Sequence, residues 1–105
     1  MSSYIEIYET TDKRLYAKGW VYDTANPGAT ARIDINSQYV FTANLPNSAC
    51  PANGNHGFEG YFNSEKDDER YMIHTFLTDS GTPVKIWDAW IDKTTGTYHS
   101  PELDP

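Results

Sequence analysis

Apolar and polar residues alternate with a period of two along most of the chain, a pattern that suits β-strands and spoils helices. The apolar positions are filled mainly by tyrosine, isoleucine, valine, phenylalanine and tryptophan, the residue types enriched in strands. Clusters of turn-forming residues separate the alternating segments at the spacing typical of a sandwich. The pattern therefore predicts an all-β domain, an antiparallel two-sheet sandwich of about seven to eight strands.

The first two strands are predicted at residues 4–8 (YIEIY) and 15–23 (LYAKGWVYD). In the first segment Ile5 and Ile7 share one face, and the opposite face carries Tyr4, Glu6 and Tyr8. In the second segment apolar residues occupy both faces, one of which carries Tyr16, Lys18, Trp20 and Tyr22. Apolar residues on both faces indicate a strand well inside a sheet.

A hairpin is predicted next, from ARIDIN (residues 31–36) and YVFTANL (residues 39–45), closed at Asn36 and Ser37. One face of each arm is apolar, with Ala31, Ile33 and Ile35 in the first arm and Tyr39, Phe41, Ala43 and Leu45 in the second. The segment from Pro46 to Gly57 has no periodicity and holds two prolines, two glycines and three asparagines, which predicts a long loop. The remaining strands are predicted at FEGYF, RYMIHTFL, VKIWDAWID and TYH.

Length and charge narrow the classes of protein to which the chain can belong. A chain of 105 residues predicts a single domain, residues 1–105, with one modest core. The 15 acidic and 8 basic residues give a formal net charge of -7, which disfavours nucleic acid and anionic membrane surfaces as partners. No run of residues is apolar and long enough to predict insertion into a membrane.

The sequence leaves the compartment open. Its first residues, MSSYIEIYE, have neither the basic nor the apolar region of a signal peptide, so we expect an export signal to be either removed or never present. The single cysteine, Cys50, cannot form a disulfide within the chain. A secreted form would have to be stable without that crosslink or pair with another chain.

Several landmarks follow the order found in a known family. They are GWVYD at residues 19–23, the hairpin at residues 31–45, and GNHGF at residues 54–58 in the long loop. This order resembles the small immunoglobulin-like β-sandwich modules of bacterial secreted and cell-wall proteins, whose hallmarks are a Gly-Trp-Ala-x-Asp strand and a Gly-x-His-Gly-Phe loop. The resemblance runs from Leu15 to Pro83 and departs at the hairpin tip, which is NSQ here. It implies an immunoglobulin-like sandwich with an accessory, non-catalytic role, secreted or at the cell surface if the chain is an excised module; a cytoplasmic location stays open.

His56 is the first candidate for chemistry, because it lies in the long loop between two glycines. A catalytic histidine needs a nucleophile or a second acid or base within reach, and the nearest groups in the sequence, Ser48, Cys50 and Glu59, form no catalytic spacing. A zinc site needs more than one imidazole or thiolate, and the other histidines, His74 and His99, fall on different predicted elements. We therefore expect no catalytic residue, no metal and no cofactor here.

We expect His56 instead to hold its loop in place. Gly54 and Gly57 allow positive φ on either side of the histidine, and Phe58 then enters the core. The resemblance implies that Asp23, at the end of GWVYD, is the hydrogen-bonding partner of His56. These five residues form the expected structural latch.

Aromatic residues are the main candidates for binding. Three tryptophans and eight tyrosines are more than one sandwich core can bury. In residues 84–92, alternation places Trp87 and Trp90 on opposite faces, and Asp88 shares the face of Trp90, which predicts Trp87 in the core and Trp90 at the surface. The expected ligand-binding site is a platform formed by Trp90, Asp88, Asp92 and Tyr98, suited to stacking on a sugar and hydrogen bonding to it. The alternative is that Trp90 covers the end of the core or a dimer contact.

The other acidic residues suggest turns. Asp67, Asp68 and Glu69 form a run that could hold calcium, but the D-x-D-x-D-G pattern of a calcium loop is absent, so a solvated turn is the preferred interpretation.

Three classes of function compete at this point. The first is a non-catalytic module that recognises carbohydrate at a bacterial surface or in a matrix. The second is a structural or assembly protein, such as a phage or cell-surface decoration subunit, whose exposed aromatics contact a surface protein. The third is an enzyme or a hydrolase accessory domain of unknown ligand, ranked last because no catalytic constellation is visible. The oligomeric state is not predicted.

Overall fold

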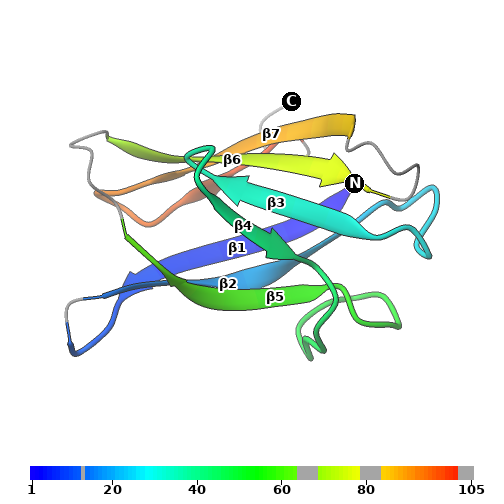
Figure 1. Cartoon of the computed structure of the whole chain (residues 1–105), viewed down its shortest axis with the longest axis horizontal. Helices are drawn as coiled ribbons and strands as arrows, with labels where there is room; N and C mark the ends of the chain where they lie inside the picture. Colours follow the sequence, from blue (N-terminus) through cyan, green and yellow to red (C-terminus); the bar gives the residue numbers. More distant parts are fainter. Residues whose placement is uncertain (13, 64–68, 79–83, 102–105) are drawn as a thin grey trace.

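The computed structural model describes residues 1–12, 14–63, 69–78 and 84–101, which form eight strands in two antiparallel sheets (Figure 1). The three-stranded sheet has the order β1 (Ser2–Glu9), β2 (Leu15–Tyr22), β5 (Gly57–Phe62). The five-stranded sheet has the order β4 (Tyr39–Thr42), β3 (Ala31–Ile35), β6 (Arg70–Leu77), β7 (Val84–Asp92), β8 (Tyr98–His99). The two sheets lie as separate layers in Figure 1, with the core between them.

Some consecutive strands are neighbours in one sheet, whereas others lie in different sheets. The pairs β1–β2, β3–β4, β6–β7 and β7–β8 remain together as antiparallel neighbours, whereas the chain changes sheet after β2, after β4 and after β5. As a result β5 pairs with β2, and β6 pairs with β3. This is the arrangement of immunoglobulin-like sandwiches, with β8 added at one edge. The predicted all-β sandwich of seven to eight strands is confirmed.

The core is built from the inward half of each alternating pattern. Its largest fully buried side chains are five isoleucines, one valine and one threonine: Ile5, Ile33, Ile35, Ile73, Ile91, Val21 and Thr75. Burying a side chain such as Ile33 contributes about 1.5–3 kcal/mol relative to leaving it exposed. Because the side-chain period is two, fixing these residues inward also fixes their neighbours outward.

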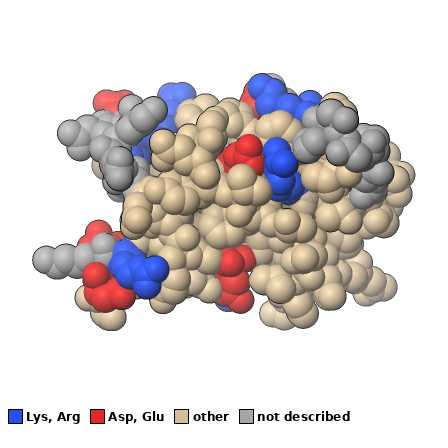
Figure 2. Space-filling model, in the orientation of Figure 1, with Lys and Arg blue, Asp and Glu red and all other residues tan. Residues whose placement is uncertain are grey.

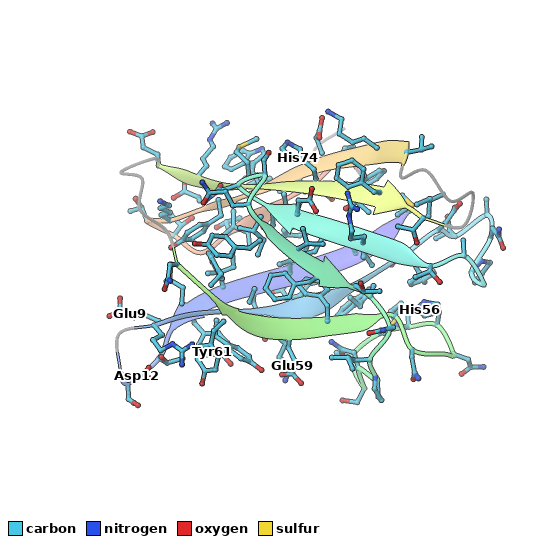
Figure 3. All side chains as sticks on the ribbon, in the orientation of Figure 1. Glu9, Asp12, His56, Glu59, Tyr61 and His74 are labelled. Atoms are coloured by element: carbon cyan, nitrogen blue, oxygen red, sulfur yellow. The ribbon has the colours of Figure 1, made fainter. Side chains whose placement is uncertain are left out.

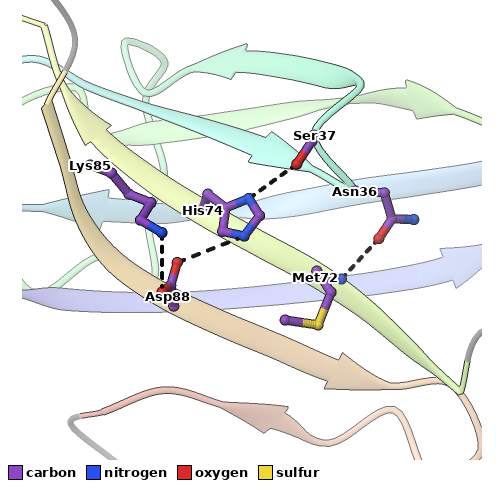
Figure 4. Close-up of polar contacts among 6 residues, drawn as sticks. All are labelled: Asn36, Ser37, Met72, His74, Lys85 and Asp88. Atoms are coloured by element: carbon purple, nitrogen blue, oxygen red, sulfur yellow. Dashed lines mark hydrogen bonds and ion pairs between the residues drawn. The ribbon is translucent and has the colours of Figure 1, made fainter.

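The predicted hairpin closes where expected. Asn36 and Ser37 both adopt left-handed backbone conformations, with φ of 53° and 59°, as a tight hairpin turn requires. Asn36 also joins the turn to β6, because its side-chain oxygen accepts a hydrogen bond from the backbone N–H of Met72 at 2.9 Å (Figure 4). The second arm is shorter than predicted, since β4 ends at Thr42 and the chain crosses to the other sheet, where Leu45 pairs with Gly57.

The pairing of β7 with β6 contains one irregularity near the start of β7. The pairing of β6 with β7 shifts between Thr75 and Phe76, so that Trp87 and Lys85 lie opposite consecutive residues of β6. Beyond the shift the alternation is regular, and Trp87 packs against the core as predicted. The described part of the chain contains no helix that could span a membrane.

Gly19 in β2 marks the closest approach of β1, and its replacement tests the pairing of these strands. A Cβ at this position would lie 2.1 Å from the carbonyl oxygen of Tyr4, a backbone atom that cannot move aside alone. We expect Gly19→Ala to push β1 away from β2 and to lower the free energy of unfolding by about 1–3 kcal/mol, measured by urea denaturation. The control is Gly28→Ala, whose Cβ would meet its nearest neighbour at 3.8 Å. Equal stability of the two variants would contradict the close approach.

Candidate ligand-binding face

The outward residues of the three-stranded sheet form three rows that run across the strands. Strand pairing places Tyr8, Tyr16 and Tyr61 in the first row, Glu6, Lys18 and Glu59 in the second, and Tyr4, Trp20 and Gly57 in the third. We call the side chains of these rows the aromatic face. Figure 3 shows Glu59 and Tyr61 projecting from this sheet on the side away from the other sheet. The face therefore combines aromatic rings at both ends with charged groups between them.

The first row is a cluster of three tyrosine rings, in which the half-buried Tyr16 lies between two exposed rings. The ring centroids of Tyr8 and Tyr16 are 5.5 Å apart, and those of Tyr16 and Tyr61 are 4.8 Å apart. Tyr8 and Tyr61 are 46% and 48% exposed, and the guanidinium of Arg14 lies 3.8 Å from the centre of the Tyr61 ring. Single exposed aromatics are common, but three in register form a contiguous apolar surface of the kind that marks interaction sites.

The second row is tied to the first by a short hydrogen bond. The hydroxyl of Tyr16 donates to a carboxylate oxygen of Glu59 at 2.5 Å. This hydrogen bond, together with burial and the negative charge of Glu59, raises the pKa of Tyr16 to about 12. The contact holds the Glu59 carboxylate beside the tyrosine cluster, where it can accept hydrogen bonds from a ligand.

The third row opens into a groove of about 420 Å³. Tyr4 and Trp20, with ring centroids 5.7 Å apart, line it together with residues of the second row and the loop residues Pro46, Asn47, Ser48 and Ala49. The side chain of Asn47 donates a hydrogen bond to the carbonyl of Gly19 at 3.1 Å. It fits there because Gly57 has no side chain: a Cβ at Gly57 would lie 2.8 Å from the Cβ of Asn47. The long loop thus supplies one wall of the groove.

The structure corrects the predicted platform at Trp90. The side chain faces outward on β7 as expected, but its ring stacks on His99 with centroids 3.8 Å apart and planes 9° apart. The guanidinium of Arg70 lies 3.8 Å from the centre of the same ring. Because His99 comes from β8 and Arg70 from β6, on either side of β7, the two side chains cover opposite faces of the indole. Trp90 therefore offers no free face for stacking on a sugar.

The other residues predicted for that platform are not brought together. Tyr98 faces inward opposite Ile91, is 6% exposed, and shares a 2.7 Å hydrogen bond with Ser3. Asp92 accepts hydrogen bonds from the backbone N–H groups of Thr94 and Thr95, and so holds the turn before β8. The error lies in the register of the last strand, which places His99 rather than Tyr98 beside Trp90.

Asp88 belongs to a separate polar cluster on the outer side of the five-stranded sheet. Its carboxylate lies 3.7 Å from Nε2 of His74 and 3.5 Å from Nζ of Lys85, while Nδ1 of His74 lies 3.5 Å from the hydroxyl of Ser37 (Figure 4). Serine, histidine and aspartate are the components of a catalytic triad. The separations are nevertheless longer than the roughly 2.6–3.2 Å typical of a nucleophile and its base. We interpret the cluster as a network that joins the hairpin turn to β6 and β7.

His56 is buried at the end of the sandwich, with 7% of its surface exposed. Its Nε2 lies 2.9 Å from the carbonyl oxygen of Asn53, and its ring packs on Tyr22 with centroids 5.0 Å apart. The backbone N–H of Val21 donates to the carbonyl of His56 at 3.1 Å. These contacts connect the long loop to the end of β2.

Two details of the expected latch are corrected. Asp23 is not the partner of His56, because its carboxylate accepts a hydrogen bond from the backbone N–H of Ala25 at 2.9 Å and holds the turn after β2. Gly54 does have positive φ, at 103°, but Gly57 is needed for close approach of the loop rather than for its own φ. Phe58 is buried in the core as predicted.

The chain matches no protein-family model, no curated protein and no solved structure. Of the acidic run considered for calcium, Asp67 and Asp68 lie outside the described residues. Within the described ranges, no group of three or more histidine, cysteine, aspartate or glutamate side chains is arranged to hold a metal ion. The geometry of the aromatic face is therefore the main structural indication of function.

The aromatic face is absent from the sequence-based predictions, although alternation within single strands indicates part of it. Alternation alone places Tyr4 and Tyr8 on one side of the first strand, and Tyr16 and Trp20 on one side of the second. The apolar residues on both faces of the second strand correctly predict a strand inside a sheet, since β2 lies between β1 and β5, but they do not by themselves indicate a binding face. The contribution of Tyr61 depends on the pairing of β5 with β2, two strands that are distant in the sequence and on opposite sides of the long loop.

The contacts of His56 predict a structural role that can be measured. We expect His56→Ala to lower the free energy of unfolding by about 1–3 kcal/mol, because it removes a buried hydrogen bond and the packing on Tyr22. His74→Ala is the control, since that side chain is 23% exposed and should cost less. Chemical denaturation of both variants provides the comparison. A His56 variant as stable as the parent would show that the histidine is not needed for folding.

The pairing of Tyr16 with Glu59 predicts a dependence on alkaline pH. The tyrosine keeps its proton to higher pH in the folded protein than its ordinary 10.0, so its stabilising effect is complete below pH 10 and is lost as the pH rises through about 12. We expect Glu59→Gln to move the pKa of Tyr16 back toward 10.0, followed by NMR titration of the ring carbons. Glu6→Gln, in the same row beyond Lys18, should leave the pKa of Tyr16 unchanged. Identical shifts in the two variants would contradict a specific Glu59 contact.

Proposed function

We propose that the protein is a non-catalytic binding module that recognises carbohydrate through its aromatic face. The observation that carries this proposal is the row of Tyr8, Tyr16 and Tyr61, in register beside a row of charged side chains, with Tyr8 and Tyr61 exposed and Tyr16 half-buried between them. Tyrosine rings pack on the apolar faces of sugar rings, while carboxylates and amines hydrogen-bond to sugar hydroxyls. The aromatic face offers both kinds of contact side by side.

The placement of these groups on strands also supports a binding role. Side chains on paired strands are held more rigidly than those on loops, and tyrosine loses little conformational freedom when it binds. The rings of the first row already contact one another, and Glu59 is already held by Tyr16. A ligand would therefore meet a surface that needs little reorganisation.

Charge favours an uncharged glycan over an anionic one. The chain has a formal net charge of -7, and Lys18 lies between two glutamates in the second row. On the side of the molecule drawn in Figure 2, basic and acidic side chains are scattered among uncharged ones and form no broad basic patch among the described residues. Anionic polymers such as nucleic acids or sulfated glycans would gain little attraction from a row of two carboxylates and one amine on a chain of negative net charge.

A lectin-like role fits the resemblance to accessory modules of bacterial cell-surface and secreted proteins, which would present the face to polysaccharide of a wall or matrix. Exposed tyrosines also suit protein interfaces, so the competing function is assembly through protein–protein contacts. The two possibilities differ in what the face contacts, and the same variants separate them.

The proposed function predicts binding that depends on the aromatic face. On a glycan array, we expect the protein to retain uncharged polysaccharides, with binding weakened about tenfold in Tyr8→Ala because one stacking contact is lost. Val40→Ala is the control, since Val40 is 56% exposed on β4 of the other sheet. Trp90→Ala should also leave binding unchanged, provided that its unfolding temperature shows an intact fold.

Two results would contradict the proposal. In the first, the protein binds no glycan on the array, and light scattering shows a stable oligomer that Tyr8→Ala disrupts. This result would assign the aromatic face to protein contacts. Binding lost in Trp90→Ala but kept in Tyr8→Ala would place the carbohydrate site on the five-stranded sheet instead.

A further inference from the structure

We infer that the ligand of the aromatic face is a linear, uncharged polysaccharide whose chain lies along the strands and is recognised over several consecutive sugars. This inference rests on the proposed function and deepens it. It concerns which part of a glycan the face recognises: the interior of an extended chain, and neither a single sugar nor a branched end.

Aromatic rings stand at both ends of the face. On β1, Tyr4 and Tyr8 are four residues apart and share the outward side, and on β2, Trp20 and Tyr16 do the same. At the rise of a β-strand, four residues span about 13 Å. One sugar ring cannot contact both aromatic rows across that distance, whereas a short run of linked sugars can.

The charged row lies where the middle of such a chain would pass. Glu6 on β1, Lys18 on β2 and Glu59 on β5 cross the face between the two aromatic rows. A carboxylate, an ammonium group and a second carboxylate provide acceptors and donors for ring hydroxyls. A sugar over this row would thus be held by hydrogen bonds, while the sugars before and after it are held by stacking.

Ring orientation argues against a chain that lies across the strands. The planes of Tyr8 and Tyr16 are tilted by 44°, and those of Tyr16 and Tyr61 by 71°, so the first row has no common plane on which consecutive sugars could stack. The guanidinium of Arg14 also covers one face of Tyr61. The row therefore provides one stacking position at one end of the face, and the Tyr4 and Trp20 pair provides the other.

The loop wall restricts the shape of the chain. Pro46, Asn47, Ser48 and Ala49 line the groove beside Trp20, and the hydrogen bond from Asn47 to Gly19 fixes them there. A bulky branch directed toward the loop would meet this wall, whereas an unbranched chain could lie in the groove beside it. The groove also exposes Tyr4, which is 46% accessible.

Chain length provides the test. Isothermal titration would use soluble oligosaccharides, from disaccharide to hexasaccharide, of the cello-, manno- and chito- series whose polymers bind on the array. We expect affinity to rise by about tenfold or more between disaccharide and tetrasaccharide, as the second aromatic row is reached, and then to level off. In Tyr4→Ala this rise should shrink while affinity for the disaccharide is kept, and Val40→Ala should reproduce the parent at every length.

The outcomes separate this inference from the proposed function. Affinity that is already complete with a mono- or disaccharide would overturn the inference and leave carbohydrate binding standing. A length dependence that persists unchanged in Tyr4→Ala, with the variant shown to be folded, would overturn the assignment of Tyr4 and Trp20 to the second stacking position. If none of the polysaccharides binds, both the proposed function and this inference fail.

Discussion

The register between β1, β2 and β5 is the constraint on which the aromatic face depends. Ile5, Ala17 and Phe58 are buried on the inner side of this sheet, and each is adjacent in sequence to residues that face outward. A slip of one residue in any of the three strands would expose that strand's buried residue and move its aromatic and charged side chains into the core. Burial of the apolar set therefore positions the rows on the outer side, without any requirement for contacts among the outward residues themselves.

Patterns within one segment were predictable because burial of its apolar residues fixes which of its side chains face outward. Alternation within one segment identified the hairpin around Asn36 and Ser37 and placed Trp87 inward and Trp90 outward. The environment of Trp90 was not predictable, because it depends on the residues that the neighbouring strands bring to either side of it. Cover by Arg70 and His99 removes the stacking surface that the exposed position suggested. Alternation within one strand therefore predicts whether an aromatic side chain faces outward, whereas the neighbouring strands determine whether its ring is free to stack on a ligand.

The long loop shows the same distinction between local and distant contacts. Its glycines were expected to serve the backbone conformation around His56, and Gly54 does so. Gly57 serves a contact with Asn47, ten residues earlier in the chain, and through it the shape of the groove beside Trp20. The hydrogen-bond partner of His56 also differs from the expected one, since it is the carbonyl of Asn53 and not the carboxylate of Asp23. The Asp23 carboxylate accepts a hydrogen bond from the backbone N–H of Ala25 in the turn after β2, and the His56 ring contacts a carbonyl of its own loop, that of Asn53.

In the proposed binding role, the aromatic face would gain affinity mainly because its side chains are already ordered before a ligand binds. The Tyr16 hydroxyl and the Glu59 carboxylate satisfy one another before any ligand arrives, and the rings of the first row restrict one another's motion. Ordering of side chains, which usually offsets much of the energy gained at an interface, has therefore largely occurred during folding. Two aromatic positions joined by one rigid sheet would also act together on the proposed chain ligand, because binding at the first would hold the chain near the second. Weak individual stacking contacts then suffice, provided that the ligand is long enough to reach both.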